Sequence, residues 1–85
     1  MNKSEFSQEL LKRLYKAGYR YIVRDSDFSL YAYWYKPVKG SMYWTMGSQP
    51  EQRSFSLFLF NDLYNYIEFE DEEPFNIAKA LGTID

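Results

Sequence analysis

The sequence predicts a small α+β domain, in which an antiparallel sheet of about four to five strands carries an N-terminal helix and a short C-terminal helix on one face. Three observations lead to this fold class. Apolar residues recur with helical spacing over residues 4–17, and they alternate with a period of two in several later segments. The connections between these segments are short, which favours antiparallel neighbours. The 85 residues suit one domain, residues 1–85.

The N-terminal helix is predicted to cover residues 4–17. Its apolar residues are spaced by four, four and three, so they share one face that we expect to be buried. Ser4 is the expected N-cap, and Gly18 is expected to end the helix in the left-handed conformation. The predicted buried residues are Phe6, Leu10, Leu14 and Ala17.

A meander of three strands is predicted next, with turn residues at 25–27 and a loop at 36–40. The expected strands cover residues 19–24, 29–35 and 41–46. In the middle strand, Leu30, Ala32 and Trp34 should face the helices. We predict that Trp34 is buried against the N-terminal helix, near Leu10 or Leu14. The opposite face of this strand holds Tyr31, Tyr33 and Tyr35.

The rest of the chain is predicted to complete the sheet. A fourth strand is expected at residues 54–60, a helical turn at 61–64 and a short fifth strand at 66–70. Pro74 suits the first turn of the C-terminal helix, and Gly82 suits its end. The apolar residues expected to face the core here are Phe55, Leu57, Leu59, Ile67 and Phe69.

The composition argues against several classes of activity. The chain has no cysteine and no histidine, which excludes disulfides, thiolate metal sites and histidine-based catalysis. Asp25 and Asp27 suit a turn better than a metal pair, since calcium needs about six to eight oxygen ligands. There is no glycine-rich phosphate loop and no visible nucleophile–base pair. We therefore predict no enzymatic activity and no cofactor.

Nothing in the sequence predicts a membrane partner. Residues 1–5 lack an apolar signal region, and no apolar run approaches the roughly 20 residues that a membrane span needs. We expect a cytoplasmic protein.

Charge is divided unevenly along the chain. Residues 1–50 carry eight basic and four acidic side chains, whereas residues 51–85 carry two basic and eight acidic ones. The strongest cluster is acidic and consists of Glu68, Glu70, Asp71, Glu72 and Glu73. It is either a solvated surface or a patch that meets a basic surface on another molecule.

Several short motifs follow one another in an order that resembles a group of small uncharacterised proteins from phages and prophages of Gram-positive bacteria. The motifs are GYRYIVRD at 18–25, LYAY at 30–33, KP at 36–37, Trp44 and EDEEP at 70–74. In that group the strand turn usually reads Asp-x-Asp-Gly, whereas this chain has Phe28 at the last position, which predicts a longer loop. The resemblance covers roughly residues 14 to 77. It implies a small accessory protein acting in the cytoplasm of a bacterial host cell, and it assigns no functional residues.

The sheet face opposite the helices is the candidate binding surface. We expect it to combine tyrosine with basic side chains, because the two helices have narrow apolar stripes and cannot cover both faces. The candidate partner-binding residues are Arg20, Arg24, Tyr31, Tyr33, Tyr35, Lys36, Lys39 and Tyr43. Such a face has three interpretations. It self-associates or is covered by the 47–53 loop, it binds another protein, or its rings stack on nucleic-acid bases.

The leading hypothesis is a phage-type accessory protein that binds a host protein, such as a defence nuclease, and inhibits or redirects it. The acidic run would then occupy a basic nucleic-acid channel. The alternatives are binding of a nucleotide or single-stranded nucleic acid, including sequestration of a nucleotide signal, and self-association as a homodimer or structural protein. Against nucleic acid, the net charge of −2 provides no clear basic footprint.

Overall fold

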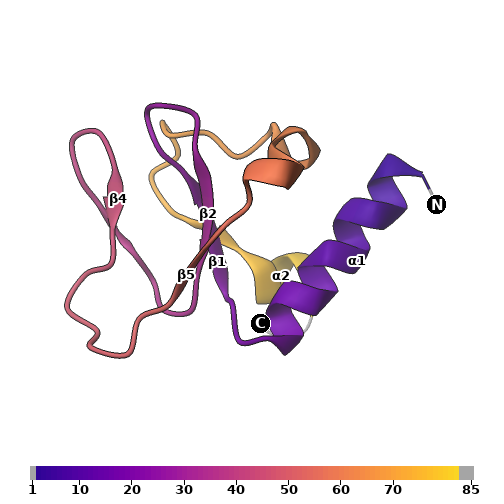
Figure 1. The fold of residues 1–85 in the computed structure, drawn as a ribbon, viewed down its shortest axis with the longest axis horizontal. Coiled ribbons are helices and arrows are strands. Elements are labelled where there is room, and N and C mark those ends of the chain that lie inside the picture. The colour runs from indigo at the N-terminus through magenta and orange to yellow at the C-terminus, as the bar shows by residue number, and fades with distance from the viewer. Residues whose placement is uncertain (1, 83–85) are drawn as a thin grey trace.

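The computed structural model describes residues 2–82 and shows the predicted mixed α+β architecture (Figure 1). Residues 1 and 83–85 of the predicted domain lie outside the described residues. Four antiparallel strands form one sheet in the order β5-β2-β1-β6, and β3 and β4 form a second, two-stranded sheet. The elements are α1 (Lys3–Lys16), β1 (Tyr21–Arg24), β2 (Leu30–Tyr33), β3 (Val38–Lys39), β4 (Trp44–Thr45), β5 (Ser54–Ser56), the 3-10 helix η1 (Phe58–Tyr64), β6 (Phe75–Asn76) and α2 (Ile77–Leu81).

Helix α1 begins at Lys3, one residue earlier than predicted. Its N-cap is Asn2, whose side chain accepts a hydrogen bond from the Glu5 amide while the Glu5 carboxylate accepts one from the Asn2 amide. This reciprocal capping box satisfies two backbone donors. Asn2 is therefore the N-cap, and Ser4, the predicted N-cap, lies inside the helix. Gly18 follows the C-cap with a φ of 103°, as predicted.

The buried stripe of α1 is rotated from the predicted one. Leu11 and Leu14 are buried, whereas Phe6 is 41% exposed and Ala17 is exposed. The physical reason is that α1 packs against both α2 and η1, so its buried surface is divided between these two helices. Phe6 meets the ring of Phe60 at its edge, with the ring centroids 5.9 Å apart.

The register of β1 and β2 corrects the predicted sheet faces. Ile22 pairs with Ala32 and Arg24 with Leu30, and paired residues share a face. Arg20, Ile22 and Arg24 therefore share the helix side of the sheet with Leu30 and Ala32, not the tyrosine side. Alternation within each strand was predictable, but the five-residue connection at 25–29 sets the register between the strands.

The third and fourth strands also differ from expectation. Residues 41–46 do not join the main sheet. Instead β5 pairs with β2, and the β3–β4 hairpin lies on the side away from the helices (Figure 1). The predicted fourth strand stops at Ser56, because Leu57 leaves the extended conformation and η1 begins. Leu57 is buried, but Leu59 is 83% exposed rather than in the core.

The predicted fifth strand at 66–70 is a turn region, and β6 occupies the place beside β1. Ile67 is nevertheless buried in the core, as expected. Pro74 precedes β6 instead of opening the last helix, which starts at Ile77 with Asn76 as its N-cap. Gly82 ends that helix in the left-handed conformation, as predicted.

Both faces of the main sheet are covered. On the helix side, Leu11, Ile22, Leu57, Tyr64 and Ile77 belong to one buried cluster. On the other side, Trp44 of the hairpin packs with buried Val23 and Tyr33, and the Tyr21, Tyr31 and Phe69 rings pack against this second cluster. Trp34 is half-buried beside Gly18 and Tyr19, and not near Leu10 or Leu14 as predicted.

Candidate functional site

The predicted tyrosine and basic residues do not form one exposed face. Tyr33 and Arg24 are buried, and the hairpin and the 66–74 segment cover the tyrosine side of the sheet. Arg20 lies over the Tyr15 ring and donates to the backbone oxygens of Tyr15 and Tyr19. The predicted stacking platform is therefore absent among residues 2–82.

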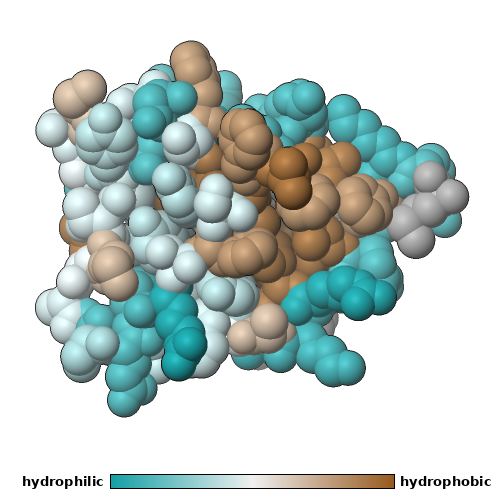
Figure 2. Space-filling view, in the orientation of Figure 1, coloured by the Kyte–Doolittle hydropathy of each residue, from teal (hydrophilic) through white to brown (hydrophobic). Residues whose placement is uncertain are grey.

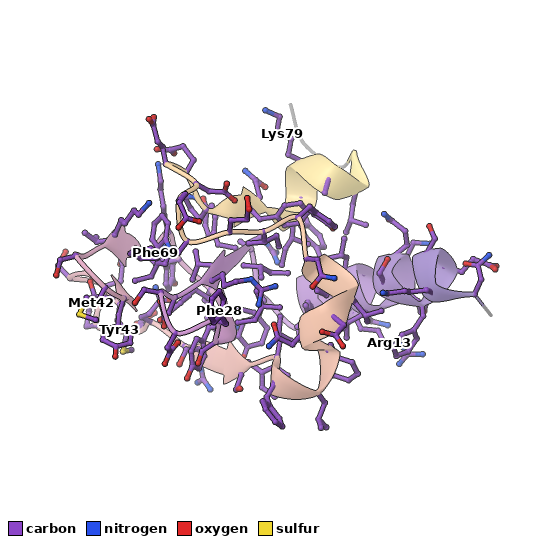
Figure 3. All side chains as sticks on the ribbon, turned by 90° about the horizontal axis from the view of Figure 1, so that it is seen from above. Arg13, Phe28, Met42, Tyr43, Phe69 and Lys79 are labelled. Atoms are coloured by element: carbon purple, nitrogen blue, oxygen red, sulfur yellow. The ribbon has the colours of Figure 1, made fainter. Side chains whose placement is uncertain are left out.

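The remaining candidates are dispersed. The Lys36 ammonium pairs with Glu73 at 2.7 Å, and Lys39 donates to the Asp71 carbonyl oxygen while lying over the Phe69 ring. Tyr43 is 48% exposed near the hairpin tip with Met42, at the end of the molecule opposite Arg13 (Figure 3). Tyr31 and Tyr35 are half-buried.

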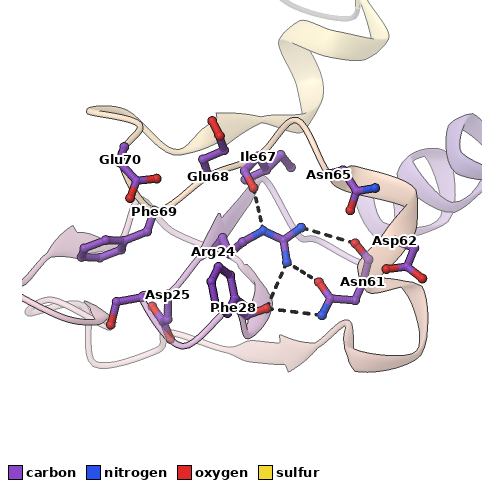
Figure 4. Close-up of a pocket in the computed structure, with 11 residues that line it drawn as sticks. Arg24, Asp25, Phe28, Asn61, Asp62, Asn65, Ile67, Glu68, Phe69 and Glu70 are labelled. Atoms are coloured by element: carbon purple, nitrogen blue, oxygen red, sulfur yellow. Dashed lines mark hydrogen bonds between the residues drawn. The ribbon is translucent and has the colours of Figure 1, made fainter.

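Arg24 holds three segments of the chain together (Figure 4). Its Nε donates to the Ile67 carbonyl oxygen at 2.6 Å, and Nη2 donates to the Tyr64 carbonyl oxygen at 2.9 Å and the Asn61 carbonyl oxygen at 3.3 Å. Nη1 donates to the Phe28 carbonyl oxygen at 3.0 Å and to Oδ1 of Asn61. All five guanidinium donors are thus engaged. Arg24 is a structural clamp, and not the exposed binding residue that the sequence suggested.

A hollow of about 400 Å³ lies above this clamp, between the 25–29 loop, η1 and the 67–70 segment. Four carboxylates line it, two of them from the predicted acidic run, and Phe28 and Phe69 supply aromatic rings. The acidic residues are Asp25, Asp62, Glu68 and Glu70. Arg24 is the basic residue in the lining, and the four carboxylates outnumber it, so the hollow presents a net acidic surface to an incoming group.

The other members of the acidic run lie outside the hollow. Asp71 accepts a hydrogen bond from the Glu68 amide and stabilises the turn, and Glu73 pairs with Lys36. Glu72 is exposed. The structure thus brings together two of the five residues of the predicted patch, Glu68 and Glu70, with acidic residues from two other segments.

Phe28 is the most unusual residue at the rim. Its φ of 72° lies in the left-handed region, where an aromatic residue is strained, and its side chain is 73% exposed. A hydrogen bond from its amide to the Asp25 carbonyl oxygen, at 3.0 Å, maintains this turn. The sequence signal was present, since the resembling proteins have glycine at this position. The predicted longer loop is not formed, because Phe28 itself adopts the positive φ and the turn closes tightly, with the Asp25 amide donating to the Ser29 carbonyl oxygen at 2.8 Å.

The Asp25 side chain is buried and accepts a hydrogen bond from one backbone amide. It is 5% exposed, and Oδ1 accepts a hydrogen bond from the Trp44 amide at 2.7 Å. Burial raises the pKa of Asp25, although the Trp44 amide partly opposes this shift. At the loop surface, Oδ1 of Asp27 accepts a hydrogen bond from the Ser29 amide, and this contact lowers the pKa of Asp27. The turn role predicted for the Asp27 side chain is confirmed, whereas the Asp25 carboxylate bonds to Trp44 of the hairpin instead of to an amide in the turn.

These opposite pKa shifts predict opposite effects of pH on stability. A carboxyl whose folded-state pKa is raised loses stability as pH rises from its unfolded pKa, about 3.9, through its folded pKa. We expect Asp25→Asn, which can still accept the Trp44 hydrogen bond, to gain stability relative to wild type between about pH 4 and pH 7. Asp27→Asn is the matched control. Because the pKa of Asp27 is lowered, the stability that its carboxylate supplies is lost mainly below its unfolded pKa of about 3.9, so this variant should change far less than Asp25→Asn between about pH 4 and pH 7. Urea unfolding at about pH 4 and at about pH 7 measures the stability of each variant relative to wild type. An equal change with pH in Asp25→Asn and Asp27→Asn would contradict the prediction.

Two further classes of site are not formed by the described part of the chain. No group of three or more histidine, cysteine, aspartate or glutamate side chains in residues 2–82 could hold a metal ion. No helix in the same range is long and apolar enough to cross a membrane.

Comparison with known proteins finds no matching family model, no similar curated protein and no similar solved structure. The fold and the acidic hollow are therefore the basis for the proposals that follow.

Proposed function

We propose that this chain is a non-enzymatic accessory protein that binds a basic surface of a host protein through the acidic hollow and the exposed Phe28 ring. The observation that supports this most is the arrangement of Phe28. A strained backbone holds an apolar ring in solvent beside four carboxylates. Contact with a partner would bury the ring and neutralise the carboxylates together. Exposed aromatic residues are frequent anchors of protein interfaces.

The chemistry of the hollow favours a lysine or arginine side chain as the group that enters it. Carboxylates can accept hydrogen bonds from either cation, and the face of the exposed Phe28 ring attracts positive charge, whereas Lys39 already lies over the Phe69 ring. Proteins that bind nucleic acids carry many such side chains in their grooves. Together with the resemblance to phage accessory proteins, this supports a defence nuclease of the bacterial host as the partner, which the chain inhibits or redirects.

Binding of nucleotides or single-stranded nucleic acid is the alternative function, and the structure supports it less. Tyr33 and Arg24, on which it relied, are buried. The hollow is lined by carboxylates that would repel phosphate groups.

Capture from host lysate with matched variants tests the proposal. Glu68→Gln combined with Glu70→Gln removes two charges from the hollow, and Glu51→Gln combined with Glu72→Gln removes two exposed charges outside it. We expect a captured host protein to associate about tenfold more slowly with the first variant than with wild type or the second, because complementary charge accelerates association. Rising salt should also weaken capture by the wild type.

Phe28→Gly separates the role of the ring from the role of the fold. Glycine adopts positive φ without strain, so the variant should remain folded while losing the captured partner. Circular dichroism and thermal unfolding measure the fold. The proposal is wrong if the partner binds all these variants equally, or if wild type captures no host protein.

A further inference from the structure

A second exposed surface is apolar, and none of its large exposed residues lines the hollow. Figure 2 shows hydrophobic side chains gathered over β5, η1 and the neighbouring part of α1. The large exposed members are Phe6 at 41%, Phe55 at 48%, Phe58 at 76% and Leu59 at 83% exposure. Contiguous apolar surface of this kind on a small domain indicates a contact site.

Strand β5 gives this surface a free hydrogen-bonding edge. It is the edge strand of the main sheet, and within residues 2–82 no strand pairs with its outer side. The Trp34 amide donates to the Arg53 carbonyl oxygen and the Leu57 amide donates to the Leu30 carbonyl oxygen. Because hydrogen-bonded pairs alternate in antiparallel ladders, Phe55 also bonds to β2, whereas the backbone groups of Ser54 and Ser56 point outward.

We propose that β5 pairs with β5 of a second copy of this chain, giving a symmetric dimer. With a two-fold axis at Phe55, Ser54 exchanges backbone hydrogen bonds with the partner's Ser56, and Ser56 with the partner's Ser54. The two Phe55 side chains then face each other as a close cross-strand pair. The sequence Ser-Phe-Ser is the same in both directions and contains no charge, so the antiparallel arrangement brings no like charges together within the strand.

The area is sufficient for such a contact. Taking about 200 Å² for a fully exposed phenylalanine or leucine, the four exposed side chains contribute roughly 500 Å² per copy. Two copies thus bury about 1,000 Å², the lower limit of a specific interface. Arg53, the nearest charged neighbour of the strand, lies over the Trp34 ring at 4.8 Å, which directs its charge away from the edge. Because the contact is isologous, it closes after two copies and does not propagate into a filament.

Sedimentation analysis over a range of protein concentrations tests this with two variants and a control. Leu59→Glu places a charge on the apolar surface at a position with little role in the monomer, and we expect at least tenfold weaker dimerisation. Met42→Glu makes the same change at the hairpin tip, where Met42 is 56% exposed, and should dimerise like wild type. Ser54→Pro removes an outward donor without removing a bond to β2, and should be monomeric.

Amide hydrogen exchange tests the same contact without a substitution. Protection of the Ser54 and Ser56 amides should increase with protein concentration, whereas the Phe55 amide, bonded within the monomer, should be protected throughout. A wild-type protein that remains monomeric at the highest soluble concentration overturns the proposal. So does a dimer that persists unchanged in Leu59→Glu and leaves the Ser54 and Ser56 amides unprotected. Neither result bears on host-protein capture by the hollow.

Discussion

Replacing Arg24 with methionine should destabilise the domain by about 3–5 kcal/mol, because it leaves several buried carbonyl oxygens without a donor. The side chain is only 8% exposed, and it supplies the hydrogen bonds for the Ile67 and Tyr64 carbonyl oxygens. Each unsatisfied buried acceptor costs about 1–3 kcal/mol. A domain of this size has a total stability of roughly 5–10 kcal/mol, so the variant should be close to unfolded at room temperature.

Urea unfolding followed by tryptophan fluorescence measures this loss. Arg13→Met is the matched control, because the Arg13 side chain is 77% exposed and pairs with Glu9 at 3.6 Å on the surface of α1. We expect the control to change stability by less than about 0.5 kcal/mol. Arg24→Lys should not restore stability, because one ammonium cannot replace a planar fork of five donors. A stable Arg24→Met protein would show that the 61–67 segment is held by apolar packing alone.

The parts of the fold that sequence analysis predicted correctly depend on local signals. The helical spacing around Leu14, the alternation of β1 and β2, and the glycines at 18 and 82 each reflect the chain's own conformational preferences. The α+β class and the placement of both helices on one face follow from them. Leu57 and Ile67 were also correctly assigned to the core.

The incorrect parts depend on contacts between distant segments. The register of β1 against β2 reversed the expected face of Arg24, because the length of the 25–29 connection cannot be inferred from alternation. The alternation typical of a strand continues in the sequence beyond Ser56. The structure has η1 there instead, because Tyr64 packs against α1. The strand beside β1 is β6, which begins at Phe75. The sequence predicted a helix here, because Pro74 immediately precedes this residue.

The candidate site was only half predictable. Its acidic character was evident from Glu68 and Glu70. The turn at 25–27 was evident from composition, but the bond from the Trp44 amide to the Asp25 carboxylate was not. Phe28 was noticed only as an exception to the glycine of the resembling proteins. The role of Asn61 in binding the Arg24 guanidinium had no sequence signal, because the two residues are 37 positions apart and belong to different elements.

Tyr64→Ala should destabilise the domain by about 3–5 kcal/mol, as expected for truncation of a fully buried aromatic residue. The ring is 0% exposed and lies in the cluster between the sheet and α1, where it joins η1 to that helix. Its hydroxyl donates to the Ser7 carbonyl oxygen at 2.8 Å. Tyr64→Phe removes only this hydrogen bond and should cost about 1 kcal/mol. Thermal unfolding of both variants measures the two contributions separately.

The same variants predict a response to alkaline pH. Burial raises the pKa of Tyr64 above its ordinary value of about 10, so the folded state retains the proton that the unfolded state loses. Stability supplied by this group is present below about pH 10 and is lost as pH rises further. Tyr64→Phe should therefore lose less stability than wild type between about pH 9 and pH 11. Identical alkaline profiles of Tyr64→Phe and wild type would mean that the Tyr64 hydroxyl reaches solvent, and that η1 separates from α1 more readily than this packing implies.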